Sequence, residues 1–119
     1  MRGVYRTDAD GRYLVRTTRP KWYPVPTDGP VGDMLRATDR HPYRPGHVHF
    51  MITAPGYTPL VTHIFDKQGE YLDSDTVFAV KDSLKVDFAE QKTQETYGKQ
   101  AGVQAPYALA QFDFVLNPA

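Results

Sequence analysis

Apolar residues gather over residues 48–54, a run that predicts a buried β-strand. Side chains alternate between the two faces of a strand, so His47 and His49 are expected on one face, and the opposite face is wholly apolar. A second apolar run over residues 60–65 predicts the next strand, with His63 on one of its faces. The turn sequence Pro-Gly-Tyr at 55–57 between the two runs favours an antiparallel pair.

The remaining pattern predicts shorter elements and a single domain over residues 1–119. Further strands are expected at 4–7 and 12–17, joined through an Asp-Gly turn as a hairpin, and at 84–88 and 111–116. One short helix is expected over residues 31–38, and the polar stretch 89–105 is expected to be a surface loop. Together these elements predict an all-β fold, an antiparallel β-sandwich with one short helix.

Four prolines between positions 20 and 30 restrict this segment to extended and turn conformations. Such a segment loses less entropy on ordering, so it can hold Trp22 and Tyr23 in fixed places. Aromatic side chains in a loop most often pack onto the core, which is the simpler interpretation of both residues.

Composition narrows the possible functions. The 119 residues carry no net charge and no cysteine, with a pI near 6.9. The charge gives no electrostatic reason to expect nucleic acid or an anionic membrane as a partner, and disulfides and thiolate chemistry are excluded. No apolar stretch approaches the roughly 20 residues that span a bilayer, and the N-terminus has no signal-peptide core. We therefore expect a cytoplasmic protein that binds neither nucleic acid nor membrane.

His47 and His49 form a candidate metal site, because two imidazoles on one face of a strand can converge on one ion. A tight site needs a further ligand, for which the candidates are nearby tyrosines and His41, His63, Asp73 and Asp75. Carboxylate with nitrogen suits zinc or ferrous iron, whereas phenolate with nitrogen favours ferric iron, and the spacing does not choose between them. A simpler interpretation makes both aspartates local turn residues and Arg44 a surface ion-pair partner. Nucleophile-elbow and phosphate-loop motifs are absent.

Several motifs in one order resemble the intradiol ring-cleavage dioxygenases, and in particular their hydroxyquinol 1,2-dioxygenase branch. The resemblance covers essentially the whole chain and is carried by residues 23–32, Arg40-His41-Pro42, 44–50, 54–57, 60–63, 71–75 and 112–116. Members of this family hold a non-haem ferric ion, Fe(III), by two tyrosinates and two histidines inside a β-sandwich. The resemblance implies that Tyr23 is the second tyrosine ligand and that His47 and His49 are the two histidine ligands.

The resemblance also implies substrate contacts. Arg44 matches the arginine beside the substrate, where it would stabilise negative charge on the ring. Val25 and Pro26 match positions that line the substrate pocket, and His63 lies one strand over and is expected to face it. The implied reaction is cleavage of a catechol-type diol, hydroxyquinol or catechol, by dioxygen to a muconate-type diacid. A polar residue that only hydrogen-bonds between strands is the alternative for His63.

One departure from the family pattern matters. The first tyrosine ligand lies upstream of Tyr23 in the family, and neither Tyr5 nor Tyr13 is its equivalent, so the chain resembles an N-terminally shortened catalytic domain. An open sandwich predicts a homo-oligomer or a partner chain that covers the exposed surface. Two alternatives follow: an inactive sandwich fragment or interaction module that keeps three of four ligands, and a hydrolytic zinc or copper site on His47 and His49.

Overall fold

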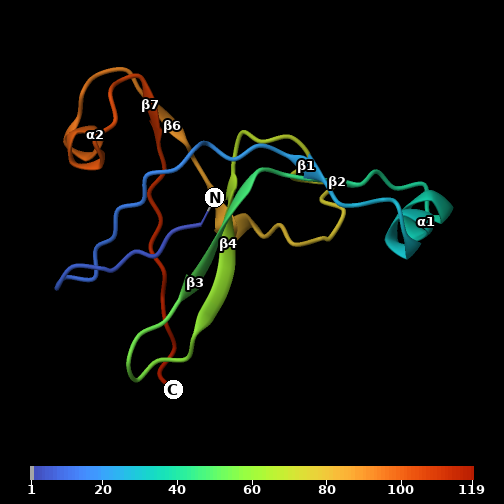
Figure 1. The fold of residues 1–119 in the computed structure, drawn as a ribbon, viewed down its shortest axis with the longest axis horizontal. Coiled ribbons are helices and arrows are strands. Elements are labelled where there is room, and N and C mark those ends of the chain that lie inside the picture. Colours follow the sequence, from blue (N-terminus) through green and yellow to red (C-terminus); the bar gives the residue numbers. More distant parts are fainter. Residues whose placement is uncertain (1) are drawn as a thin grey trace. The chain divides into compact units, whose positions relative to one another are not determined.

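The computed structural model describes residues 2–119, in which strands outnumber helices and no sheet closes into a barrel (Figure 1). The elements are β1 (Tyr23–Pro24), α1 (Pro30–Ala37), β2 (Tyr43–Arg44), β3 (His47–Ile52), β4 (Leu60–Asp66), the 3₁₀-helix η1 (Asp82–Leu84), β5 (Lys85–Val86), β6 (Ala89–Gln91), α2 (Thr96–Ala101) and β7 (Tyr107–Leu109). They fall into two compact units. One comprises residues 2–19 with Ala89–Leu109, and the other comprises Pro20–Phe88 with Ala110–Ala119.

The β3–β4 hairpin is the long element of the second unit, as the two green arrows of Figure 1 show. The strands pair antiparallel, and His49 lies opposite His63 while Met51 lies opposite Val61. Cross-strand partners share a face, so the predicted alternation is confirmed: the histidines share one face with Met51 and Val61, and Val48 and Ile64 lie on the other. The predicted bounds of both strands are right to within two residues.

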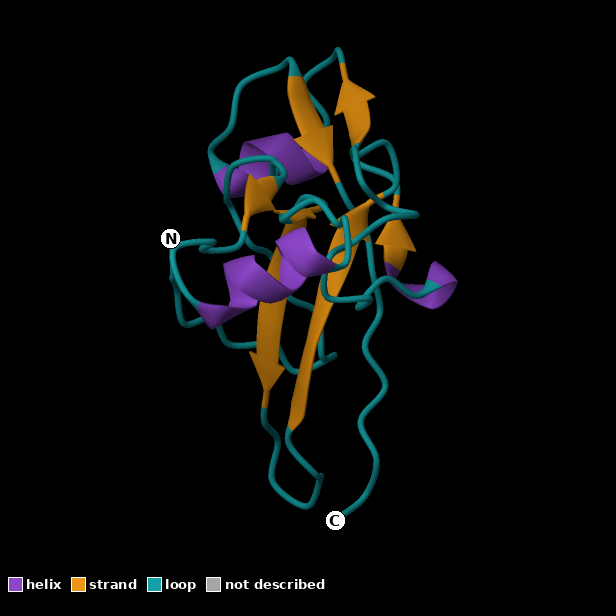
Figure 2. Ribbon diagram, turned by 90° about the vertical axis from the view of Figure 1, so that its right-hand side faces the viewer, coloured by secondary structure: helices purple, strands orange, loops and turns teal. Residues whose placement is uncertain are grey.

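The aliphatic face of this hairpin carries the core. Ile64, Val86 and Phe88 are buried together, with Val48, Phe50, Ala110, Phe112 and Phe114 packed against them. The C-terminal segment runs beside the hairpin (Figures 1 and 2), and the Thr58 N–H donates to the Asn117 carbonyl at 2.9 Å. The prediction of a strand at 111–116 is wrong, because the segment contributes its phenylalanines to the core without joining a ladder.

The strand predicted at 84–88 is shorter than expected and pairs differently. The backbone forms η1 over Asp82–Leu84, and β5 then pairs in parallel with the end of β4 through Phe65 and Lys85. The expectation of a purely antiparallel arrangement is therefore wrong at this edge. A short parallel ladder requires the chain to cross over first, and residues 67–84 make that crossover.

The short β1–β2 ladder connects the proline-rich segment to the hairpin. Tyr23 lies opposite Arg44 in this ladder, so the segment that carries the tyrosine is fixed beside the strand entry that carries the arginine. Pro45 is fully buried and leads into β3. Between the two strands, α1 confirms the predicted helix; Pro30 occupies its first turn and Leu35 is buried.

The other unit departs most from the prediction. The turn at residues 8–11 forms, with the Asp8 N–H donating to the Arg12 carbonyl at 2.9 Å and Gly11 at φ 77°, but no strands form at 4–7 or 12–17. The prediction of a loop over 89–105 is also wrong: β6 pairs antiparallel with β7, and α2 lies between them in sequence. The left-handed Gly102 ends α2.

Within residues 2–119, neither helix has the length and apolar character that crossing a membrane requires.

Candidate metal and substrate site

The face of β3 that points away from the core brings His47 and His49 together. Their Nε2 atoms lie 3.1 Å apart, and the two ring planes are nearly perpendicular. Two imidazole nitrogens that bind one ion at about 2.1 Å each and roughly at right angles lie about 3 Å apart. The two side chains are therefore already arranged as neighbouring ligands of a single ion.

Contacts behind His47 fix its tautomer. Its Nδ1 lies 2.7 Å from the Pro45 carbonyl, which can only accept, so Nδ1 carries the proton and the Nε2 lone pair faces the site. Burial lowers the pKa of His47, and the neighbouring Arg44 lowers it further. Burial likewise lowers the pKa of His49, followed by the charges of His63 and Arg44. Both imidazoles therefore favour the neutral form that a metal ligand requires.

Tyr23 lies beside the histidines. Its ring centroid is 5.6 Å from that of His47, and the side chain is 43% exposed, so the phenol is not packed into the core. Tyr23 also lies opposite Arg44 in the β1–β2 ladder. The simpler interpretation, in which both aromatics of the proline-rich segment pack onto the core, is not observed for Trp22 either: it is 41% exposed, and its ring contacts Tyr43 and Tyr71 edge-on.

Arg44 is buried and paired rather than a surface residue. It is 8% exposed, and Asp75, which is 3% exposed, accepts from its Nε at 3.1 Å and from its Nη2 at 3.4 Å. The remaining nitrogen, Nη1, lies 3.3 Å from Nε2 of His47. Burial alone raises the pKa of Asp75, but hydrogen bonds from Arg44 and from the Ala79 and Val77 N–H groups leave it lowered. The site therefore holds a fixed positive charge beside the histidines.

His63 faces the same side as the two candidate ligands. Its ring centroid lies 5.4 Å from that of His49 and 5.7 Å from that of His47. Its Nε2 lies 3.4 Å from the Ala79 carbonyl, at the end of the loop that Asp75 begins. The predicted contact of His63 with substrate stays a prediction, and its hydrogen-bond partner is a loop carbonyl rather than a neighbouring strand.

The other candidate ligands lie elsewhere. Asp75 is committed to Arg44, and the exposed Asp73 lies 3.9 Å from the Lys85 ammonium. The His41 ring packs against Tyr43 and Tyr71, and its Nδ1 accepts from the Tyr43 N–H. Among the described residues, no group of three or more His, Cys, Asp or Glu side chains is placed to hold a metal ion.

The donors present therefore fit a ferric ion better than zinc. Two neutral imidazoles and one phenol, His47, His49 and Tyr23, supply nitrogen and hard oxygen donors, and no carboxylate joins them. Val25 is half-buried, with its N–H on the Pro42 carbonyl, and Pro26 is exposed. Their predicted contact with substrate stays a prediction.

Two features of the segment that follows Asp73 were not predicted. A cavity of about 450 Å³ has Arg40, Asp75 and Phe78 in its wall. The next residue after Asp75, Thr76, has a buried hydroxyl, Oγ1, without a hydrogen-bond partner in the described residues. The local turn interaction expected of Asp75 is confirmed by hydrogen bonds from the Val77 and Ala79 N–H groups, but its pairing with Arg44 was not predicted. The signal that could have found the pair is that a buried arginine requires a buried acid.

Comparisons with known proteins agree with this geometry. The sequence model of a protein family described as Dioxygenase matches residues 1–118. Hydroxyquinol 1,2-dioxygenase of Rhizobium sp. (strain MTP-10005) is 58% identical over 88 residues, which are 74% of this chain and 30% of that protein. 6-Chlorohydroxyquinol 1,2-dioxygenase of Cupriavidus pinatubonensis is 52% identical over 117 residues, 98% of this chain and 38% of that protein.

A solved structure extends the likeness to three dimensions. The crystal structure of hydroxyquinol 1,2-dioxygenase from Pseudomonas putida DLL-E4 superposes with a TM-score of 0.86 at 48% identity. The superposition covers 96% of this chain and 40% of that one. The chain thus spans well under half the length of these relatives.

Proposed function

The chain belongs to the intradiol ring-cleavage dioxygenase family, and from this premise we propose that it is the ligand-bearing part of a ferric ring-cleaving enzyme. Its substrate is a catechol-type diol, hydroxyquinol or catechol, which dioxygen opens between the two hydroxyl-bearing carbons. Both oxygen atoms of dioxygen enter the muconate-type diacid, so no external reductant is needed. The observation that carries the proposal is the 3.1 Å approach of the His47 and His49 Nε2 atoms beside the buried Arg44.

The proposed roles follow from the contacts. His47, His49 and Tyr23 hold the ferric ion, which supplies Lewis acidity that favours the deprotonated, electron-rich diol. Tyr23 is the proposed base that takes a hydroxyl proton from an incoming diol, because its phenol ring lies beside His47 and its strand pairs with that of Arg44. Arg44 stabilises the negative charge that develops on the ring during attack, and it needs no reorganisation because it is already fixed.

Three residues are proposed to shape the space for the ring. His63 faces the histidines and its Nε2–H is held by the Ala79 carbonyl, so the neutral ring can accept a hydrogen bond from a ring hydroxyl at Nδ1. Val25 and Pro26 lie two and three residues after Tyr23, so they would contact the diol from the same side as the tyrosine. In this proposal the strands belong to one β-sandwich domain, the C-terminal part of a longer catalytic domain.

Loading the purified chain with ferric iron tests the metal site. We expect a visible absorption band from tyrosinate-to-iron charge transfer, and Tyr23→Phe should remove it because no other tyrosine is assigned to the metal. Tyr57→Phe is the matched control, since Tyr57 is 46% exposed and lies on the turn between β3 and β4. A chain that stays colourless with ferric iron, or a band that survives in Tyr23→Phe, contradicts the proposed ligand set.

Oxygen uptake with hydroxyquinol and with catechol then tests the activity. We expect one molecule of dioxygen consumed per diol and a diacid product, with the ratio of the two rates identifying the preferred ring. Bound iron without turnover of either diol contradicts the proposed activity and supports the second candidate function below.

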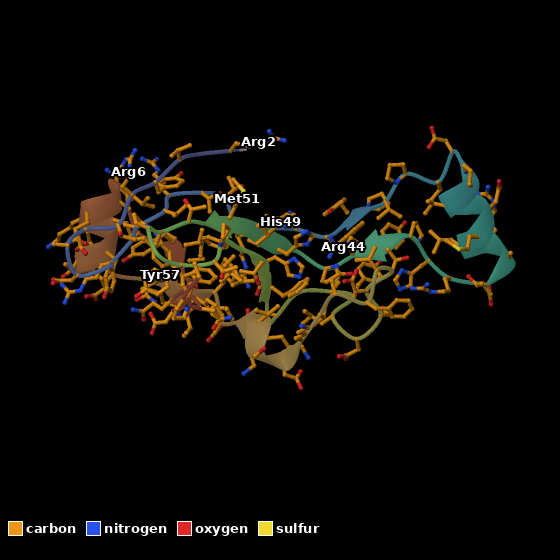
Figure 3. The ribbon with its side chains drawn as sticks, turned by 90° about the horizontal axis from the view of Figure 1, so that it is seen from below. Arg2, Arg6, Arg44, His49, Met51 and Tyr57 are labelled. Carbon is orange, nitrogen blue, oxygen red and sulfur yellow. The ribbon has the colours of Figure 1, made fainter. Side chains whose placement is uncertain are left out.

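A specific observation favours that second candidate, a binding module that needs another polypeptide. The site face continues past His49 to Met51 (Figure 3), which is 78% exposed, and Val61, its cross-strand partner, is 72% exposed. Exposed aliphatic side chains beside a candidate site are typical of a surface that another chain covers. A homo-oligomer or a partner chain would bury these side chains. Light scattering tests this, because either assembly has a mass above the 13.5 kDa of one chain.

A further inference from the structure

The carboxylate of Asp75 organises the arginine side of the site. It accepts from Nε and Nη2 of Arg44, which are neighbouring nitrogens on one edge of the guanidinium group. Because the guanidinium is planar, two hydrogen bonds along one edge fix its plane as well as its position. The third nitrogen, Nη1, then has a single direction available, and it lies 3.3 Å from His47 Nε2.

The same carboxylate also shapes the loop that follows it. The Val77 N–H donates to Oδ1 at 3.3 Å and the Ala79 N–H donates to Oδ2 at 3.0 Å. Within this loop Phe78 has a φ of 55°, a left-handed conformation that a bulky residue adopts only when its surroundings hold it there. The Ala79 carbonyl in turn lies 3.4 Å from His63 Nε2. One side chain therefore connects to both polar groups proposed to face the substrate.

We propose that Asp75 is the positioning residue of the site, which holds the Arg44 guanidinium toward the histidines and sets the loop that orients His63. It touches neither metal nor substrate and acts through these two side chains. The proposal rests on the proposed function, because Arg44 and His63 have a catalytic environment only if the diol binds there. It goes beyond that function by assigning a role to a residue 31 positions from Arg44 in sequence.

Two substitutions separate positioning from folding. Asp75→Asn keeps the shape and removes the charge. Asp75→Glu keeps the charge and moves the carboxylate by roughly one bond length. It therefore tests the effect of a displaced Arg44 guanidinium in a chain that keeps the ion pair. Asp73→Asn is the matched control, because Asp73 lies in the same loop with a side chain 99% exposed.

Steady-state turnover of hydroxyquinol by the iron-loaded chain gives the first readout. A displacement of about 1 Å in a catalytic group costs on the order of 100-fold, so we expect kcat to fall about 100-fold in both Asp75 variants. KM and the tyrosinate-to-iron band should change little, because the ligands stay in place, and Asp73→Asn should match the native chain. Native kcat in Asp75→Asn, or in Asp75→Glu if Asp75→Asn does not fold, overturns the proposal.

The Arg44 Nε–H signal in the metal-free chain gives a second readout that does not need activity. We expect slow hydrogen exchange for this proton in the native chain and fast exchange in Asp75→Asn. Slow exchange in that variant, or in Asp75→Glu if Asp75→Asn does not fold, overturns the assignment of Asp75. A native chain that binds iron without turnover refutes the proposed function, and the exchange measurement then decides the role of Asp75 separately.

Discussion

The two faces of the β3–β4 hairpin share one backbone but differ in their side chains and in what packs against them. One face packs Phe50 and Ile64 against the C-terminal phenylalanines. The other places three imidazoles within 6 Å of one another and then exposes Met51 and Val61. Strand alternation alone produces this division, so stability and chemistry can be changed separately on adjacent residues.

The difference teaches how a small unit can hold a site rigidly. The histidines are positioned by a ladder whose other face is packed, so they need few contacts of their own. Arg44 and Asp75 come from outside the ladder, and each holds the other through a buried ion pair. The positions of the candidate ligands His47 and His49 therefore depend on the packed core, whereas the position of Arg44 depends on Asp75.

The largest expected effect comes from breaking the packed face. Ile64→Ala removes a buried side chain and leaves a cavity, so we expect the free energy of unfolding to fall by about 2–5 kcal/mol. Val61→Ala, on the opposite face of the same strand, should change it by less than about 0.5 kcal/mol because that side chain is already in solvent. Urea unfolding measures both. Equal losses would mean that another chain covers the site face.

The next effect should appear in metal affinity rather than stability. Groups that only orient metal ligands contribute about 10–100-fold to affinity, so removing a ligand with His49→Asn should weaken ferric binding by at least about 100-fold. Met51→Ala, two residues along on the same face, is the control and should bind iron as the native chain does. The titration is followed through the visible band. Unchanged affinity in His49→Asn excludes His49 as a ligand.

A smaller effect follows from the lowered pKa values of His47 and His49. Their folded pKa values lie below the ordinary value near 6.5, so the unfolded chain binds more protons when the pH falls below about 6.5. The stability that the neutral imidazoles contribute is therefore present above that pH and is lost as the pH falls through the folded values. We expect the urea midpoint of the metal-free chain to be lower at pH 5 than at pH 7.5, and the double variant His47→Gln, His49→Asn to lose much of this dependence. A native-sized pH dependence in the double variant would contradict this origin.

Sequence reasoning succeeded where one physical signal dominated. The apolar alternation of the hairpin predicted both strands and the face of each histidine. Asp28 near the start, with Met34 and Leu35 as apolar contacts, predicted α1. Resemblance to a family supplied Tyr23, which no local pattern singles out because its partner in the ladder lies 21 residues away. The ligand roles themselves stay predictions.

Sequence reasoning failed where the paired residues are far apart in the chain or the strands are very short. Strands β6 and β7 have three residues each and no apolar alternation, so the polar stretch that contains them resembles a loop. The expected strand at 111–116 has the right alternation, yet its phenylalanines pack without a neighbouring ladder. The Arg44–Asp75 pair joins β2 to a loop 31 residues later, and turn patterns, which span only a few residues, cannot reveal such a partner.

The smallest expected effect tests whether a buried, unpartnered hydroxyl beside Asp75 lowers the free energy of unfolding. Thr76 follows Asp75, and its Oγ1 is buried without a partner, a state that costs about 1–3 kcal/mol relative to a hydrogen-bonded or apolar group. Thr76→Val replaces the hydroxyl by a methyl group of the same size, so we expect the free energy of unfolding to rise by about 1 kcal/mol. Thr38→Val is the opposite control: its hydroxyl donates to the Met34 carbonyl at 2.8 Å, and its loss should destabilise the chain slightly. Thermal unfolding of both variants gives the two signs, and a destabilised Thr76→Val would show that the hydroxyl has a partner. If Thr76→Val is more stable but binds the diol more weakly, the Thr76 hydroxyl contributes to substrate binding at the expense of stability.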